Sequence, residues 1–239
     1  AVTSSKAYEY CKNSIRKKTT PRYVRKQMRD WMRIAEGKDD KYFVSEKKVQ
    51  QIENILKLLI MPKGLKAGQS MYKCATGYQW LIYTAMLCTV YRDIPKKRRY
   101  ETGLLEICRK NFKTYTVGTI FIILFLTEPR FSKFYSVAPD GAISKEIKEA
   151  ISDTIKSSPL IYEYKGAKRF KLLRDYIKFK PNENTLIPLA YSNNRMDGRM
   201  PNAFIADEVG ALPNGYPVEA MRSGQLNVVN KLGFVISTK

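Results

Sequence analysis

A run of ten mostly apolar residues, 117–126, constrains the fold of this 239-residue chain more than any other sequence feature. Only Gly118 and Thr119 interrupt it. A helix that crosses a bilayer needs about 20 apolar residues, so this run is too short to span a membrane. The sequence therefore predicts a buried element, and a chain of this length can build a sizeable core around it.

Strand-like and helix-like stretches alternate from about residue 74 onward. The expected strands are 104–108, 134–138, 203–206 and 234–237. The expected helices are 79–91, 114–126 and one that Ser144 caps, and segments 169–179 and 185–190 are expected to form a hairpin. Such alternation indicates an α/β fold with a largely parallel, buried sheet.

The first 73 residues are basic and read as mostly helical. They carry 18 Lys or Arg against 7 Asp or Glu. Pro21 suits the first turn of one helix, and Ser45 suits the N-cap of the next. Segment 61–70 holds a proline, two glycines and a serine, so it is the expected linker. We therefore expect a basic helical N-terminal region, 1–73, followed by a core, 74–239.

The net charge of +21 and the absence of histidine narrow the function. Without histidine, Ser-His-Asp triads and imidazole zinc sites are excluded. A surplus of positive charge favours polyanionic partners, either nucleic acid or an anionic membrane. Each basic cluster (12–33, 92–113 and 165–180) also fits a solvated surface by itself. Among them, 92–99 and 165–180 are the favoured nucleic-acid contacts. The four cysteines, which lack C-x-x-C spacing, are expected to be reduced thiols.

Segment 109–114 lies between an expected strand and the apolar helix. It reads Arg109-Lys110-Asn111-Phe112-Lys113-Thr114. A phosphate-binding loop works in this context, because backbone N–H groups, a lysine and a Thr hydroxyl then face a nucleotide. The standard pattern needs glycine where this chain has Ile107 and Phe112. On spacing alone, a basic turn before an amphipathic helix is the favoured interpretation.

Two adjacent carboxylates, Asp207 and Glu208, follow the expected strand 203–206. This matches a Walker B arrangement, in which the first acid holds Mg²⁺ and the second polarises the attacking water. An ordinary strand with an acidic exit turn explains the pair equally well by itself. Together with segment 109–114, however, the order and spacing fit one nucleotide site.

At this point the chain resembles the large terminase subunits of tailed phages, whose phosphate-binding loop has the form R-K-N-G-K-[ST]. Loop 196–201 leading into 206–209 is also similar to the family. Tyr78-Gln79-Trp80 resembles the segment with which the family recognises adenine, and Ser237-Thr238 resembles its coupling motif. Tyr42-Phe43 with the following helix is similar to the N-terminal region of the family.

The resemblance implies a P-loop NTPase fold of the ASCE/RecA-like class, with ATP and Mg²⁺ as cofactors. Thr114 and Asp207 would hold Mg²⁺, and Glu208 would activate water. Gln79 would read adenine, although it also suits a helix cap. The implied ATP-binding residues are Gln79, Arg109, Lys110, Asn111, Phe112, Lys113 and Thr114. Arg109 would also stabilise transition-state charge, and Ser237 and Thr238 would couple hydrolysis to DNA movement, although a polar strand end explains these two nearly as well.

The implied function is an ATPase motor that moves double-stranded DNA into a procapsid. The implied partners are DNA, the small terminase subunit, the portal protein and further copies of the chain in a ring, with no membrane. The motor would act in the host cytoplasm, docked transiently at the portal. The family's C-terminal nuclease domain is not expected within residues 1–239.

Phe112 is the main departure from the family, which has glycine there so that the backbone can approach the phosphate. We expect the loop to relax, with Lys113 turned away from the phosphate position and nucleotide binding weakened. A nucleic-acid-binding module with a degenerate, inactive loop is therefore the alternative function. Binding to a membrane surface is a third option. If the ATPase interpretation holds, Lys113, Thr114, Asp207 and Glu208 converge on one cleft.

Overall fold

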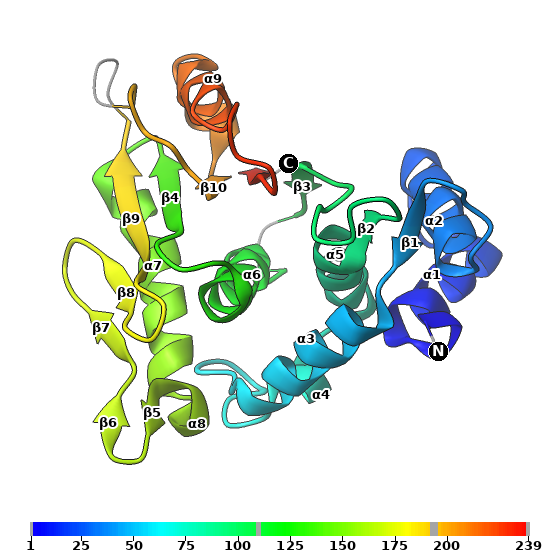
Figure 1. Cartoon of the computed structure of the whole chain (residues 1–239), viewed down its shortest axis with the longest axis horizontal. Helices are drawn as coiled ribbons and strands as arrows, with labels where there is room; N and C mark the ends of the chain where they lie inside the picture. The colour runs from blue at the N-terminus through cyan, green and yellow to red at the C-terminus, as the bar shows by residue number, and fades with distance from the viewer. Residues whose placement is uncertain (1, 109–110, 192–195, 238–239) are drawn as a thin grey trace. The chain divides into compact units, whose positions relative to one another are not determined.

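The structure is a computed structural model that describes residues 2–108, 111–191 and 196–237 (Figure 1). The chain divides into two compact units. Unit 1 comprises Ala1–Lys57 and Met71–Tyr100, and unit 2 comprises Leu58–Ser70 and Glu101–Lys239. This division differs from the expected boundary between residues 73 and 74, because residues 71–100 cluster with the N-terminal helices.

Unit 1 is mainly helical. Helix α1 packs against α2 and α5. The approach of α1 to α5 requires Gly77, since a Cβ there would lie 2.1 Å from the ring of Tyr10. Buried Trp31 donates a hydrogen bond from Nε1 to Thr89 Oγ1 over 3.1 Å. The elements are η1 (Val2–Ser4), α1 (Lys6–Lys17), α2 (Arg22–Ala35), β1 (Tyr42–Val44), α3 (Glu46–Leu58), α4 (Met71–Cys74), α5 (Gly77–Cys88) and β2 (Thr89–Tyr91).

The helix starts expected in this region are confirmed, but one helix end is not. Helix α2 begins directly after Pro21, and the Ser45 hydroxyl accepts a bond from the Lys48 N–H at the start of α3. The helix expected over 79–91 ends at Cys88. Residues 89–91 form strand β2, because Thr89 and Val90 are β-branched and pair with β1 in an antiparallel ribbon.

Unit 2 is built on a sheet with the strand order β3-β11-β10-β4-β9-β8-β7. Strands β3, β11, β10, β4 and β9 are parallel, and β8 and β7 are antiparallel additions. The expected α/β fold and its four strands are thus confirmed. The elements are β3 (Thr102–Glu106), α6 (Lys113–Thr127), β4 (Lys133–Ala138), α7 (Gly141–Lys156), α8 (Pro159–Tyr162), β5 (Glu163–Tyr164), β6 (Ala167–Lys168), β7 (Phe170–Leu172), β8 (Ile177–Phe179), β9 (Asn184–Ala190), β10 (Ala203–Ala206), η2 (Val209–Ala211), α9 (Tyr216–Ser223) and β11 (Leu232–Ser237).

The apolar run lies in α6, at the centre of the unit 2 core. Val117 and residues 120–125 are at most 1% exposed, so the predicted buried element is confirmed. The ring of Phe125 packs edge-on against Phe134 of β4 at a centroid distance of 5.3 Å. Helix α7 packs along β4 and β9 (Figure 1). None of the described helices is long and apolar enough to cross a membrane.

The other face of the sheet carries a second apolar cluster. Successive strand residues point to opposite faces, so Tyr135 of β4 and Phe204 of β10 lie on the side away from Phe134. They are buried with Ala220 and Met221 of α9. Unit 2 is therefore layered, with α6 on one face of the sheet and α9 on the other.

The expected start of one helix in unit 2 is wrong, whereas the expected hairpin forms with a shorter first strand. Ser144 lies inside α7, and the N-cap is Asp140, whose carboxylate accepts bonds from the N–H groups of Ala142 and Ile143 at 2.8 and 2.9 Å. An Asp carboxylate satisfies the free donors of a first turn, so the helix begins earlier. Segment 169–179 forms two strands, β7 and β8, and the expected hairpin is made by β8 and β9.

The segment expected to be a linker, 61–70, packs within unit 2. Lys63 forms an ion pair with Asp153 of α7 at 2.6 Å. The Ile60 N–H, just before the segment, donates to the Ser158 hydroxyl at 2.8 Å. The turn is therefore anchored on the α7–α8 side of unit 2 and is not a free tether.

Candidate nucleotide-binding site

The sheet brings the two sequence motifs to one edge. Strands β3 and β10 are parallel and lie on either side of β11, so their carboxyl ends meet at the same edge. Segment 109–114 follows β3, the acid pair follows β10, and Ser237 ends β11. Ligands of open α/β sheets bind at this kind of edge.

Asp207 is held rigidly at the end of β10. All four residues of the strand are buried, and the Asp207 side chain is 2% exposed. Its N–H donates to the Val137 carbonyl at 2.8 Å, and its Oδ1 accepts from the Glu208 N–H at 2.8 Å. Burial raises the pKa of Asp207, and the nearby Lys113 ammonium opposes that rise.

Glu208 turns the chain out of the strand. Its backbone is left-handed, with φ 48° and ψ 45°, and it precedes the short helix η2. This conformation is uncommon for residues other than glycine and is concentrated at functional sites. The Glu208 side chain is 28% exposed, so its carboxylate can meet water.

Phe112 occupies a turn of the kind that glycine favours. It is the N-cap of α6 with φ 58° and ψ 27°, and its side chain is 50% exposed. Its carbonyl accepts bonds from both the N–H and the hydroxyl of Thr116, each at 2.9 Å. The expected relaxation of the loop is therefore not what the structure shows. A bulky residue held in this conformation costs of the order of 1–3 kcal/mol.

Lys113 connects the two motifs. Its ammonium makes an ion-paired hydrogen bond with Glu208 Oε1 and lies 3.4 Å from Asp207 Oδ1. The Lys113 side chain is 13% exposed. The lysine thus points into the acid pair, contrary to the expectation that it turns away from the site. Thr114 follows it in the first turn of α6, half-buried.

Ser237 lies beside the loop that follows the acids. Its carbonyl accepts from the Ile107 N–H at 3.4 Å, next to the end of β3. A Cβ built on Gly210 would lie 3.3 Å from the Ser237 hydroxyl oxygen, so the glycine allows a close approach. Gly210 is not among the predicted site residues, and its only sequence signal is a glycine two residues after the acid pair.

Of the other predicted site residues, Asn111 and Gln79 are among the described residues. Asn111 donates from Nδ2 to the Cys108 carbonyl at 3.1 Å. Arg109, Lys110 and Thr238 lie outside the described residues. Gln79 belongs to unit 1, where its Oε1 accepts from the N–H and hydroxyl of Thr76 at 2.8 and 3.1 Å. Gln79 therefore caps α5, and its contact with adenine stays a prediction.

The oxygen-bearing side chains at this edge are of the type that would hold a magnesium ion together with a nucleotide. Mg²⁺ prefers oxygen ligands and is held in such sites by one or two carboxylates together with phosphates. Asp207 and Thr114 supply such oxygens. Among the described residues, no group of three or more His, Cys, Asp or Glu side chains is placed to hold a metal ion. Phosphate and water oxygens would thus complete the set.

Comparison with known proteins agrees with this geometry. A family model for the ATPase domain of the terminase large subunit matches residues 77–239. The large terminase of bacteriophage HK97 is similar in structure, with a TM-score of 0.64 and 19% identity. That match covers 80% of this chain and 37% of the HK97 protein, so this chain spans well under half of its length. No curated protein matches the chain by sequence.

Two other solved structures are more distant. The ATPase domain of the Thermus phage P74-26 large terminase has a TM-score of 0.44 and 16% identity, over 57% of this chain and 58% of that one. The large terminase of a thermophilic bacteriophage in complex with ADP has a TM-score of 0.43 and 18% identity, over 56% of this chain and 33% of that one. The HK97 likeness shows a shared fold, and the family model covers most of the sequence. The chain therefore belongs to the terminase large subunit ATPase domain family.

Proposed function

We propose that this chain is the ATPase motor of a viral large terminase, which couples Mg-ATP hydrolysis to the movement of double-stranded DNA into a procapsid. The contact of Lys113 with Asp207 and Glu208 carries the proposal, because it joins a phosphate-binding loop to an acid pair at one sheet edge. The proposed partners are a small terminase subunit, the portal protein and further copies of the chain in a ring. The motor would work in the host cytoplasm at the portal.

Lys113 and Glu208 act as exchangeable partners in this mechanism. Phosphate oxygens and the Glu208 carboxylate compete for the same ammonium, so phosphate binding frees Glu208. The released carboxylate then orients the attacking water and accepts its proton. Thr114 and Asp207 would hold Mg²⁺, which neutralises charge on the phosphates when bound.

The remaining roles are assigned by position. Ser237 would report the state of the phosphates, since it packs against Gly210, two residues beyond Glu208. Arg109 would stabilise charge on the transferred phosphoryl group, and Thr238 would act with Ser237 in coupling. Gln79 would contact adenine. Lys110 and Asn111 would complete the loop around the phosphates.

Phe112 favours a second candidate function. A phenylalanine at a position suited to glycine supports a nucleic-acid-binding module whose loop no longer takes nucleotide. The two candidates differ in one property, because only the motor binds Mg-ATP.

Comparing the wild-type chain with Glu208→Gln tests the proposal. We expect the variant to lose about 10²- to 10⁴-fold in ATP turnover, since the general base is removed. Nucleotide affinity should be kept or should rise, because neutral Gln competes less with phosphate for Lys113. Glu219→Gln, on the exposed side of α9, is the matched control and should turn over like wild type. Turnover by Glu208→Gln equal to wild type would make Glu208 a structural acid. Absence of Mg-ATP binding by the wild-type chain would select the second candidate.

A further inference from the structure

The positive charge of the chain is concentrated in unit 1. This unit holds 21 Lys and Arg against eight Asp and Glu, so it carries 13 of the 21 net charges in the smaller part of the sequence. The largest cluster lies between Glu9 and Asp30, where eight Lys and Arg occur with no acidic residue. In the structure this stretch is the helical hairpin formed by α1 and α2.

The hairpin exposes six of these cations to solvent, at the turn between the helices and along one side of α2, and we call these six side chains the cation face. Residues 18–21 join the two helices, and both helices present exposed cations beside this turn. Residues 22, 26 and 29 follow the i, i+4, i+7 spacing that places side chains on one side of α2, along about 10 Å. The cation face consists of Arg16, Lys17, Lys18, Arg22, Lys26 and Arg29, all of which are exposed.

The cation face has no counter-charge of its own. Over the described ranges of the chain, none of its six side chains forms an ion pair or lies over an aromatic ring. The start of α2 adds to the positive potential, because Pro21 gives no side-chain cap and the first turn lacks an acid. Unpaired cations at this density repel one another and attract a polyanion.

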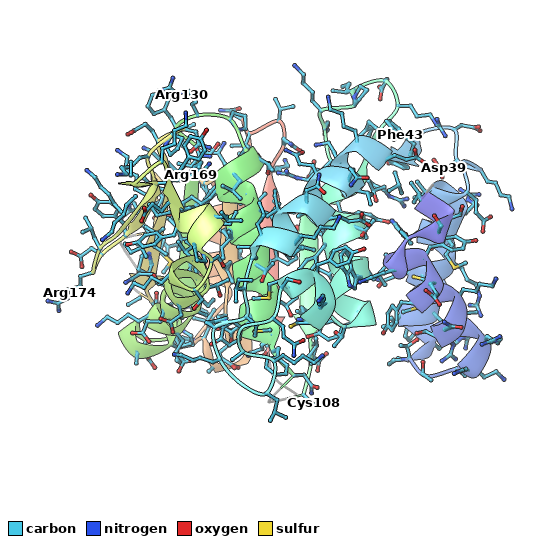
Figure 2. The ribbon with its side chains drawn as sticks, turned by 90° about the horizontal axis from the view of Figure 1, so that it is seen from below. Asp39, Phe43, Cys108, Arg130, Arg169 and Arg174 are labelled. Atoms are coloured by element: carbon cyan, nitrogen blue, oxygen red, sulfur yellow. The ribbon has the colours of Figure 1, made fainter. Side chains whose placement is uncertain are left out.

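The other two basic clusters are already engaged within the protein. In the 92–99 cluster, Lys97 lies over the ring of Tyr91, Arg99 lies over Tyr42, and Arg98 is buried. In the 165–180 cluster, Arg169 lies over Phe179. Lys178 in that cluster pairs with Glu183. Arg174 extends outward from the turn between β7 and β8 (Figure 2). The expectation that these clusters contact nucleic acid first stays a prediction, but these contacts within the protein lead us to favour the α1–α2 hairpin.

We propose that the cation face of the α1–α2 hairpin binds the phosphate backbone of duplex DNA. The inference rests on the proposed function, in which duplex DNA is the moving partner. Duplex DNA carries about one charge per 1.7 Å of its axis, so an unpaired row of cations releases condensed counterions on contact. A membrane surface is the weaker fit, because an interfacial helix needs a free apolar face. The apolar face of α2, with Met28, Trp31 and Ile34, is buried in unit 1.

Duplex binding by a charge-reversed chain tests the proposal. The double variant Lys26→Glu with Arg29→Glu is compared with Lys171→Glu with Arg174→Glu, which changes the net charge equally on the β7–β8 hairpin. Binding of a labelled random-sequence duplex is measured between about 50 and 200 mM salt. We expect the affinity of the first variant to fall at least about tenfold. The slope of log K against log salt should become less steep by about two, since each of the two lost phosphate contacts contributes about 0.9 to it. The second should stay close to wild type.

Several results would overturn the proposal. Equal losses in both variants would show only an effect of net charge, and a loss confined to the β7–β8 variant would move the contact to unit 2. If the α1–α2 variant no longer binds phosphatidylserine vesicles but binds duplex as wild type does, the cation face binds membranes and not DNA. If wild type binds no duplex, both this inference and the DNA part of the proposed function fall. If it binds duplex through this face but shows no ATP turnover, only the motor fails. A thermal melt confirms that each variant is folded.

Discussion

The two halves of the candidate site reach the same sheet edge by different means. Asp207 ends a fully buried strand, so core packing fixes its position. Lys113 follows Phe112, a half-exposed residue with a left-handed backbone, so the local loop conformation fixes its position. The position of the acid pair is therefore tied to the stability of the fold, whereas the position of the phosphate-binding loop is adjustable. Substitutions in the two halves should therefore have different signatures.

The largest effect is expected for Lys113→Ala, which removes the link between the halves. A hydrogen bond to a charged group contributes about 1.5–3 kcal/mol, so nucleotide affinity should fall about 100-fold by calorimetric titration with Mg-ATP. Lys63→Ala is the control, because Lys63 also pairs with a carboxylate but is 68% exposed and should matter little. If Lys113→Ala binds Mg-ATP as tightly as wild type, Lys113 does not contribute to nucleotide binding.

Phe112→Gly tests the phosphate-binding loop. Glycine removes the Cβ that keeps the backbone from the phosphate, and a gain of about 1.4 kcal/mol would make Mg-ATP bind about ten times more tightly. The backbone strain is already present in the nucleotide-free chain, so its relief raises stability instead. Phe131→Gly is a matched control, since Phe131 is also exposed and left-handed, with φ 64°, but lies in the turn before β4. Both variants should melt at a higher temperature than wild type. An equal change in affinity for both, or none for Phe112→Gly, would show that phenylalanine is accommodated in the loop.

Asp207→Asn tests the acid half through its pH dependence. Burial raises the pKa of Asp207, so the folded state disfavours its charged form. The loss of folding free energy from burying the charged carboxylate is absent at a pH below the ordinary Asp pKa. It is fully present once the pH exceeds the raised pKa of Asp207. Replacement by neutral Asn should therefore raise the melting temperature by a few degrees at pH 8, and the gain should shrink towards pH 4. A melting temperature that falls at pH 8 would show that the attraction of Lys113 outweighs burial.

The smallest effect concerns Cys108, whose carbonyl anchors Asn111 at the start of the loop. Cys108 is exposed (Figure 2), while Cys11, Cys74 and Cys88 are buried. Burial raises the pKa of Cys11 to about 12, which leaves little reactive thiolate. A maleimide should therefore label Cys108 first, and Mg-ATP should slow that labelling several-fold. Labelling of Cys108 at the same rate with and without Mg-ATP would argue against a nucleotide in the adjacent loop.

Much of the fold could be predicted from the sequence, because it depends on the local pattern of apolar and polar residues. The apolar run of α6 and the strand before Asp207 are buried as their composition indicates. The start of α7 was misassigned, because Asp140 and Ser144 are both good N-cap residues and only the backbone path selects one. The placement of 58–70 in unit 2 depends on long-range contacts such as Lys63 with Asp153, which no local pattern reports.

The sequence predicts which residues belong to the candidate site, but it does not predict which of their side chains contact one another. The family resemblance named Lys113 and Glu208, yet their direct pairing follows from strand order, which sets β3 and β10 on either side of β11. The left-handed backbone of Phe112 was expected to relax, because the intrinsic preference of a bulky residue opposes it. Two bonds from Thr116 to the Phe112 carbonyl help to hold the turn in place. Hydrogen bonds in the first turn of α6 therefore oppose the intrinsic preference of the residue that departs from the family.

A crystal structure of the chain with Mg²⁺ and a non-hydrolysable ATP analogue would test the central claim most directly. The claim is that Lys113 exchanges Glu208 for the phosphates of ATP. The account predicts that the Lys113 ammonium lies about 3 Å from a β- or γ-phosphate oxygen, as hydrogen bonding requires, and no longer contacts the Glu208 carboxylate. A nucleotide bound elsewhere, or phosphates bound while Lys113 stays paired with Glu208, would contradict it.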